Sequence, residues 1–267
     1  MAKPIARSSP IKRPSPASVS IQLLPVRGVP EIHKGDDLPK LIVEAVRFAG
    51  GKFASGDVIV IAQKIVSKAE GRTAQLSTVQ PSTEAVSIAQ FVQNDPRMVE
   101  VILRESRRIV RQGPHALIVE THHGFVCANA GVDRSNVPGD DVVTLLPRDP
   151  DRSARLLAAS FRRLTGKRVA VIISDTFGRP WRLGLTNVAI GAAGVPVLLD
   201  LRGTSDRAGK PLHATILAVA DELAAAAGLV MGKAAGTPVV VIRGFRYRPV
   251  LQPAASVIRP ASEDLFR

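Results

Sequence analysis

The chain has 267 residues, of which 45% are hydrophobic, which is enough for one large domain or two small domains with a packed core. Its 36 Lys and Arg residues outnumber 23 Asp and Glu residues, and the resulting formal net charge of +13 favours anionic ligands. The single cysteine, Cys127, excludes an internal disulfide, and no segment has the roughly 20 uninterrupted apolar residues of a membrane span, so we expect a cytoplasmic protein without a membrane partner.

The first 18 residues are expected to form a disordered basic tail. Residues 1–18 carry four basic and no acidic residues among many Ser and Pro residues, and they lack the apolar core of a secretory signal. Residues 20–24 then predict a short strand, and the Pro- and Gly-rich residues 25–32 predict a rigid loop. Such a loop can hold a nucleotide, or it can be a plain connection.

A helix and a strand follow, and then a stretch with two lysines four residues apart. Apolar residues at helical spacing predict a helix over 38–48, and the nearly all-apolar residues 57–62 predict a strand covered on both faces. If residues 63–71 are helical, Lys64 and Lys68 lie on one face, where an anion between them would relieve their repulsion. A solvated lysine face explains the same pattern.

The middle of the chain is predicted to hold two helices and two strands. Helical spacing predicts helices over 83–93 and 97–110, and apolar runs predict strands over 116–120 and 124–128. The second helix is strongly basic, and we assign its arginines to a solvated face.

Small and polar residues over 129–139 predict a loop that begins where the last of these strands ends. It contains Asp133 and Asn136, three residues apart. Asp133 is placed to meet Asp175 across a cleft and complete a site for a hard cation. An Asx-turn explains Asp133 equally well from the local sequence.

An apolar strand predicted over 168–174 ends directly in a group of chemically active side chains. Asp175 and Thr176 offer hard oxygen ligands for Mg²⁺ or Mn²⁺, and the nearby Arg179 and Arg182 can hold phosphate or carboxylate oxygens. A strand followed by a capped turn, with the arginines solvated, explains the local pattern as well.

Helices and strands alternate around this strand, which predicts the α/β class. A well-capped helix over 149–165 precedes it. A strand over 195–201, a helix over 215–227 closed by Gly228, and a strand over 238–242 follow. The sequence contains neither GxxxxGK[ST] nor GxGxxG, so a bound nucleotide would be held without those loops.

Five motifs occur in the same order as in one known family: GVPEI, AQKIVSKAEG, NAGVDRSNV, SDTFGRPWRLGLTNVAIGAAG and AVADELAAAAGLVMGK. On these motifs the chain resembles the coenzyme F420-0:L-glutamate ligase (F420-0:gamma-glutamyl ligase) family over about residues 21–245, in its stand-alone form without the nitroreductase-like domain. The resemblance implies an unusual mixed α/β (α+β) fold of two subdomains with a cleft between them, in an intertwined homodimer. We therefore expect a ligase domain over 19–245 and a C-terminal tail over 246–267.

The resemblance also implies an activity and its participants. Members join L-glutamate to the carboxylate of F420-0, a deazaflavin phosphodiester, with GTP as co-substrate, two Mg²⁺ or Mn²⁺ ions per site, and K⁺ as a further candidate ion. Arg179 and Arg182 are substrate-binding candidates from their charge and place. Carried over by position, the metal ligands are Asp133, Asp175 and Thr176, and the nucleotide contacts are Val29, Pro30, Glu31, Ile32, Gln63, Lys64, Lys68 and Asn136. Our catalytic candidates are Asp175 and Lys68, together with Arg179, which is chosen from its charge and place only.

Three residues depart from the family pattern. Gln63 stands where relatives have Ser, Asn187 stands where they have Asp, and Ile216 stands where an acidic residue commonly follows a Thr. These departures bear on substrate choice and on the number of glutamates added more than on the fold.

Two other interpretations of the sequence remain open. One is a related acid–amine ligase that acts on another phosphorylated acid. The other is a non-catalytic nucleotide- or nucleic-acid-binding protein, which would explain the charge and would bind in a strongly salt-dependent manner. Because the chain has one Trp and one Tyr and no run of aromatic residues among the basic ones, we expect no specific nucleic-acid partner.

Overall fold

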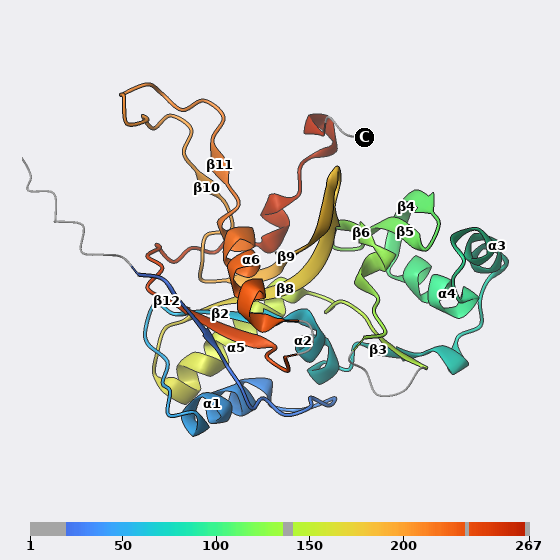
Figure 1. The fold of residues 1–267 in the computed structure, drawn as a ribbon, viewed down its shortest axis with the longest axis horizontal. Coiled ribbons are helices and arrows are strands. Elements are labelled where there is room, and N and C mark those ends of the chain that lie inside the picture. Colours follow the sequence, from blue (N-terminus) through green and yellow to red (C-terminus); the bar gives the residue numbers. More distant parts are fainter. Residues whose placement is uncertain (1–19, 136–140, 233–234, 265–267) are drawn as a thin grey trace, which may run out of the picture.

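A mixed five-stranded sheet forms the centre of the computed structural model, which describes residues 20–135, 141–232 and 235–264 (Figure 1). The parallel pair β2–β8 lies inside the sheet, and the other neighbouring strands are antiparallel. The fold is therefore mixed α/β, as predicted. Across the sheet the strands are β1 (Gln22–Pro25), β12 (Val239–Arg243), β2 (Val58–Ala62), β8 (Ala170–Arg179) and β9 (Arg182–Ala193).

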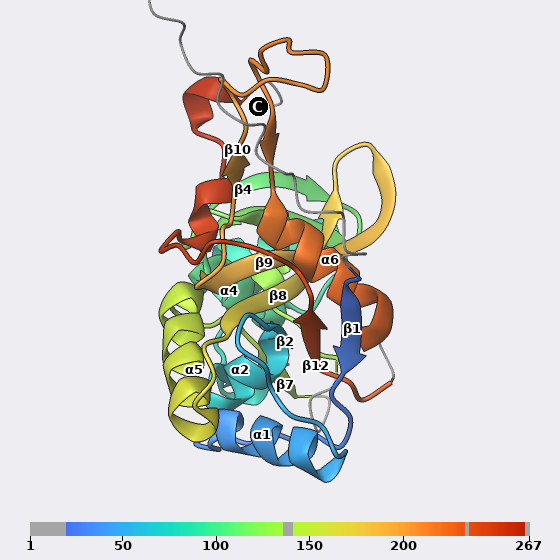
Figure 2. The same cartoon turned by 90° about the vertical axis from the view of Figure 1, so that its left-hand side faces the viewer.

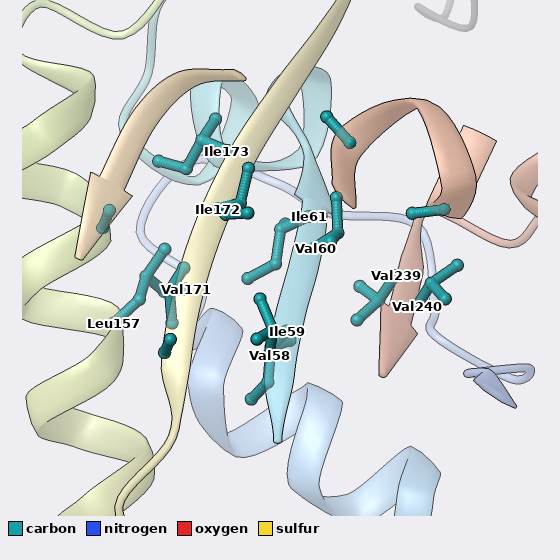
Figure 3. Packing of buried hydrophobic residues seen from close by; sticks show 14 of the residues in the cluster. Val58, Ile59, Val60, Ile61, Leu157, Val171, Ile172, Ile173, Val239 and Val240 are labelled. Carbon is teal, nitrogen blue, oxygen red and sulfur yellow. The ribbon is translucent and has the colours of Figure 1, made fainter. Parts of the chain in front are cut away.

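The two central strands are apolar throughout because both of their faces are covered. Residues 58–61 of β2 and 171–173 of β8 are fully buried, and Figure 3 shows their side chains packed toward neighbouring elements. This confirms the strand predicted to be covered on both faces. Figure 2 shows α5 on one side of β8 and β9 and α6 on the other. The helices around the sheet are α1 (Leu38–Phe48), α2 (Gln63–Ala69), α5 (Pro150–Thr165) and α6 (Val219–Met231).

A second hydrophobic core lies in the part of the molecule drawn in green in Figure 1. It is built by α3 (Thr83–Val92) and α4 (Pro96–Arg104) against a three-stranded sheet. That sheet consists of β4 (Ser106–Gly113), β5 (Ala116–Thr121) and β6 (Val126–Ala128). The short strands β3 (Thr73–Gln75) and β7 (Val142–Thr144) pair beside this core. Short 3₁₀ helices cover Leu76–Thr78, Asn129–Gly131, Ala254–Val257 and Ala261–Glu263.

The helix predicted over 97–110 is wrong in its second half. α4 ends at Arg104, and the basic residues after it form β4, which pairs with β5. Arg108 donates to the Glu120 carboxylate at 2.8 Å across this pair. The local sequence of residues 105–110 also suits a helix, but hydrogen bonding to the neighbouring strand β5 decides in favour of a strand. A spacing pattern within the segment does not reveal this partner.

Two predictions near the end of the chain also need correction. α6 begins at Val219, four residues later than predicted, and it continues through Gly228 to Met231. Gly228 is needed for close packing, because a Cβ there would lie 2.9 Å from the Asn187 Cγ atom. Of the strand predicted over 195–201, only β10 (Leu199–Asp200) forms, and it pairs with β11 (Ile216–Leu217) in the projecting arm seen in Figure 1.

The predicted tail over 1–18 lies outside the described residues. Among those that are described, no helix combines the length and the apolar character needed to cross a membrane.

Gly191 should be intolerant of even one added carbon. A Cβ at this position of β9 would lie 2.4 Å from the carbonyl oxygen of Pro150, the first residue of α5. Since that atom belongs to the backbone, α5 would have to move. We expect Gly191→Ala to lower the free energy of unfolding by about 2–3 kcal/mol in urea titrations, as overpacked cores do. Gly113→Ala is the control, because the nearest atom to its Cβ lies at 4.0 Å; equal losses for both variants would refute the steric argument.

Candidate functional site

A cavity of about 400 Å³ opens where the parallel pairing of β2 with β8 ends. Ala62 and Ser174 are partners in the parallel register, so the first turn of α2 and residue 175 lie beside each other. Ligands commonly bind at such an edge because the loops that leave parallel strands diverge there. Nine of the residues predicted to form the site line this cavity: Val29, Pro30, Glu31, Ile32, Gln63, Lys64, Lys68, Asp175 and Thr176.

The two predicted lysines both lie on α2, and each pairs with a carboxylate from a different segment. Lys64 Nζ lies 2.7 Å from Asp133 Oδ2 and also donates to the Ser135 hydroxyl. Lys68 Nζ lies 2.5 Å from Glu31 Oε1. Lys68 is only 7% exposed, so a solvated lysine face does not describe it. A buried ammonium at the wall of a cavity is a strong site for an anion.

Asp133 reaches the site through Lys64 and does not itself line the cavity. Burial raises the pKa of the Asp133 carboxyl, but the hydrogen bonds from Lys64 and Ser135 outweigh burial and leave that pKa below its usual range. Asp133 is therefore a carboxylate at neutral pH. The Ser135 N–H donates to Asp133 Oδ1 at 2.7 Å, which forms the Asx-type turn that was the alternative explanation of Asp133.

Asp175 and Thr176 were expected to follow the end of a strand, but they lie within β8. The strand continues to Arg179, and its pairing with β9 shifts register between Ile173 and Ser174. Such a bulge turns the following side chains relative to the sheet. The Asp175 carboxylate accepts from the Thr176 N–H at 2.8 Å, and the Thr176 hydroxyl lies 3.4 Å from Asn187 Oδ1.

The oxygen atoms near this cavity suit a hard divalent cation. Asp175 and Thr176 line it, and Asp133 forms an ion pair with Lys64, which also lines it. Within the described ranges no group of three or more His, Cys, Asp or Glu side chains comes together. Mg²⁺, however, is usually held by one or two carboxylates together with substrate phosphates and waters. The residues therefore fit such an ion bound together with a phosphorylated substrate.

The remaining predicted residues lie elsewhere. Arg179 and Arg182 lie at the exposed tip of the β8–β9 hairpin, where Arg179 donates to the Leu183 carbonyl at 3.4 Å. Neither arginine lines the cavity. Asn136 lies outside the described residues. The structure thus brings together the lysines, Asp175 and Thr176, but not the two arginines.

Two buried polar atoms lie in the cavity wall, one on the predicted residue Gln63 and one on Ser174, which the sequence analysis did not single out. Among the described residues, Gln63 Nε2 and Ser174 Oγ have no hydrogen-bond partner, although the two residues are 1% and 2% exposed. The Ser67 hydroxyl donates to Gln63 Oε1 at 2.8 Å and so fixes the amide. Because buried polar groups are almost always hydrogen-bonded, these two atoms are placed to receive polar atoms of a ligand. Nothing in the local sequence distinguishes Ser174 from an ordinary strand residue.

Cys127 should be chemically inert in the folded protein. Burial raises the pKa of its thiol to about 12 from an ordinary value of 9.0, and the negative charge of Asp175 acts in the same direction. The reactive thiolate is then about a thousandfold scarcer at neutral pH than for an ordinary thiol. We expect a disulfide reagent such as DTNB to label the unfolded chain within minutes and the native chain at least a hundredfold more slowly. Rapid stoichiometric labelling of the native protein would contradict this.

Comparison with known proteins places the chain in a family. Residues 28–244, which include the whole lining of the cavity, match the model of the family described as F420-0:Gamma-glutamyl ligase. The chain belongs to this family. The F420-0:gamma-glutamyl ligases are enzymes, so the cavity described above is the candidate active site of a ligase.

Named relatives of this F420-0:gamma-glutamyl ligase family member extend the similarity over nearly the whole chain. Coenzyme F420:L-glutamate ligase from Methanothermobacter thermautotrophicus is 47% identical over 93% of this chain and 100% of the relative. The enzyme of the same name from Methanopyrus kandleri is 48% identical over 93% of this chain and 98% of its own length. That from Methanocaldococcus jannaschii is 46% identical over 79% and 85%, respectively.

Proposed function

We propose that the chain joins L-glutamate to the carboxylate of coenzyme F420-0 and uses GTP as the phosphoryl donor. The observation that carries the proposal is the cavity wall itself, which Lys64, Lys68 and Asp175 line together where the parallel pairing of β2 with β8 ends. This arrangement suits a bound polyphosphate, and relatives at 46–48% identity are named for the ligation of F420 and glutamate.

The proposed chemistry has two steps because a carboxylate is a poor acyl donor. A carboxylate oxygen of F420-0 attacks the γ-phosphorus of GTP, the bond to the bridging oxygen breaks, and GDP leaves. The amine of glutamate then attacks the carbonyl carbon of the acyl phosphate. The carbon–oxygen bond to phosphate breaks, inorganic phosphate leaves, and the amine nitrogen loses a proton. Repetition on the new glutamate would add further gamma-linked residues.

The lysines hold and neutralise the phosphates in this scheme. A transferring phosphoryl group needs little covalent help, so position and positive charge supply most of the stabilisation. Glu31 and Asp133 orient the two ammonium groups, at 2.5 and 2.7 Å. The loop 29–32, Gln63 and Asn136 are proposed to contact the nucleotide.

Asp133, Asp175 and Thr176 are proposed to hold Mg²⁺ or Mn²⁺, two ions per site, with K⁺ as a further candidate. Bound there, a divalent ion supplies positive charge next to the phosphate oxygens. The protein's own part is to present carboxylate and hydroxyl oxygens, which are the ligands that such hard cations prefer.

We also propose that the protein is a homodimer whose contact includes the β8–β9 hairpin. Its tip exposes Trp181 (77%), Leu183 (100%) and Leu185 (63%), and large apolar side chains exposed together on one hairpin are typical of an interface. Leu183→Asp combined with Leu185→Asp should convert a dimer into a monomer in light scattering. A monomeric parent protein, or a double variant that stays dimeric, would refute this contact.

One assay tests the main proposal. The protein is incubated with F420-0, L-glutamate, GTP and Mn²⁺, while product mass and phosphate release are followed, with ATP in place of GTP as the control. We expect a product heavier by one glutamyl residue for each phosphate released from GTP. No glutamyl adduct and no GTP-dependent phosphate would reject the proposal.

A second candidate is a related acid–amine ligase that acts on another phosphorylated acid. It is favoured by Gln63 and Asn187, which depart from the family pattern and both line the cavity. Ile216, the third departure, lies on the arm strand β11 and does not line it. Glutamate-dependent phosphate release with other phosphorylated acids, but not with F420-0, would establish this alternative.

A further inference from the structure

A second cavity, of about 790 Å³, lies at the other end of the central strands, next to the residues that precede β2 and β8. Its lining comes from residues 54–57 before β2, residues 168–169 before β8, Gly194 after β9, three residues of α5 (Ala158, Ala159 and Arg162), and residues 243–247 with Pro249 at and after the end of β12. The candidate active site lies where the parallel pairing of β2 with β8 ends, so the length of this paired segment separates the two cavities. Its volume falls within the range of small-molecule sites.

The lining of this second cavity is strongly basic. Among the described residues, the lining contains four arginines and a single carboxylate, that of Asp57. Asp57 is 2% exposed and is already engaged by Arg243 at 2.7 and 2.9 Å. Across the described part of the chain, no carboxylate lies within ion-pair distance of Arg162, Arg168 or Arg246. Three guanidinium groups around one cavity are therefore uncompensated by acidic side chains.

An aromatic pair and small apolar side chains form another part of the wall. The rings of Phe245 and Tyr247 are stacked, with centroids 5.7 Å apart and an interplanar angle of 18°. Both residues are half-buried and line the cavity, as do Ala158 and Val169. A stacked pair of this kind offers a surface for a further planar ring, whereas guanidinium groups bind phosphate oxygens in a fixed planar geometry.

We infer that this cavity is a second ligand site, distinct from the candidate active site, which binds a small phosphorylated ring compound such as a nucleoside monophosphate. The arginines take the phosphate, and the Phe245–Tyr247 wall takes the ring. A ligand that carries only one of these two parts should bind more weakly, because half of the lining would be unused. The inference does not depend on the proposed ligase reaction.

Tyr247 provides a direct probe, because it is the only tyrosine in the chain. Protein made with 3-fluorotyrosine gives one ¹⁹F signal from the wall of this cavity. We expect adenosine monophosphate to shift that signal saturably, with at least tenfold higher affinity than either inorganic phosphate or adenosine at the same ionic strength. The absence of a saturable shift, or equal affinities for adenosine monophosphate and inorganic phosphate, would overturn the inference.

Matched variants locate the binding. Arg162→Gln combined with Arg168→Gln should weaken adenosine monophosphate at least tenfold, whereas Arg163→Gln, on the same helix but outside the lining, should leave it unchanged. Lys68→Met, which alters the other cavity, should also leave the titration unchanged. Loss of the ¹⁹F shift in Lys68→Met would show that the ligand occupies the candidate active site and would overturn the inference. Undiminished binding by the double variant would do the same.

Discussion

Lys68→Met should lower kcat for glutamate-dependent phosphate release from GTP by about 10²–10³-fold, the usual effect of removing one preorganised group that stabilises developing charge. Lys68 is 7% exposed in the cavity wall, so its charge acts through a medium that screens it poorly. Methionine keeps the length and most of the volume of the side chain but removes the ammonium group. The fall should therefore appear in kcat rather than as a loss of folded protein.

The stability of this variant separates a catalytic role from a structural one. Removing Lys68 leaves Glu31 without that partner, but the Glu31 side chain is 56% exposed and can be hydrated. We expect the free energy of unfolding to change by less than about 1 kcal/mol. Lys40→Met is the matched control, because Lys40 has a 61% exposed side chain that pairs weakly with Glu44. Full activity in Lys68→Met would remove this lysine from the mechanism.

Elements with strong local signals could be predicted from the sequence. The helix Leu38–Phe48 was predicted to the residue, because Asp37 caps it and its apolar side chains follow helical spacing. The helix Pro150–Thr165 was predicted equally well, because Asp149 caps its start and Gly166 adopts the left-handed conformation at its end. The two ends of this second helix are set by Asp149 and Gly166, which lie next to them in the sequence, so no distant contact is needed to place them.

Elements that depend on distant partners could not be predicted in this way. β4 forms because β5 lies beside it. α6 continues through Gly228, where the missing side chain leaves room for Asn187 of β9. β8 continues past Asp175 because β9 pairs with it as far as Arg182. In each case the deciding contact joins segments whose approach is not encoded in local spacing.

The candidate site was predictable where its residues follow parallel strands. Lys64, Lys68 and Asp175 come after or within β2 and β8, and parallel pairing brings them to one edge of the sheet. Arg179 and Arg182 follow closely in the sequence, but β8 extends away from the cavity and carries them to the hairpin tip. Sequence proximity to Asp175 was therefore a poor guide to their position.

Arg243→Met should lower the free energy of unfolding by about 3 kcal/mol, because it leaves a buried carboxylate without its cation. Arg243 binds Asp57 through two nitrogens at 2.7 and 2.9 Å and also donates to the Lys52 carbonyl at 2.8 Å. Asp57 is 2% exposed, and its remaining side-chain hydrogen bond comes from the Ala54 N–H at 2.7 Å. The pair therefore joins the end of β12 to the loop that precedes β2.

A second arginine–aspartate pair isolates the effect of burial. Arg202 binds Asp200 in a similar two-pronged geometry at 2.6 Å, but the two side chains are 54% and 47% exposed. Arg202→Met should thus cost less than about 1 kcal/mol, since water can replace the lost partner. Adding Asp57→Asn to Arg243→Met should recover much of the lost stability, because the neutral amide can still accept from Ala54 without carrying an uncompensated charge. Equal losses in Arg243→Met and Arg202→Met by urea unfolding would show that contact geometry, rather than the desolvation of Asp57, determines the contribution of the pair.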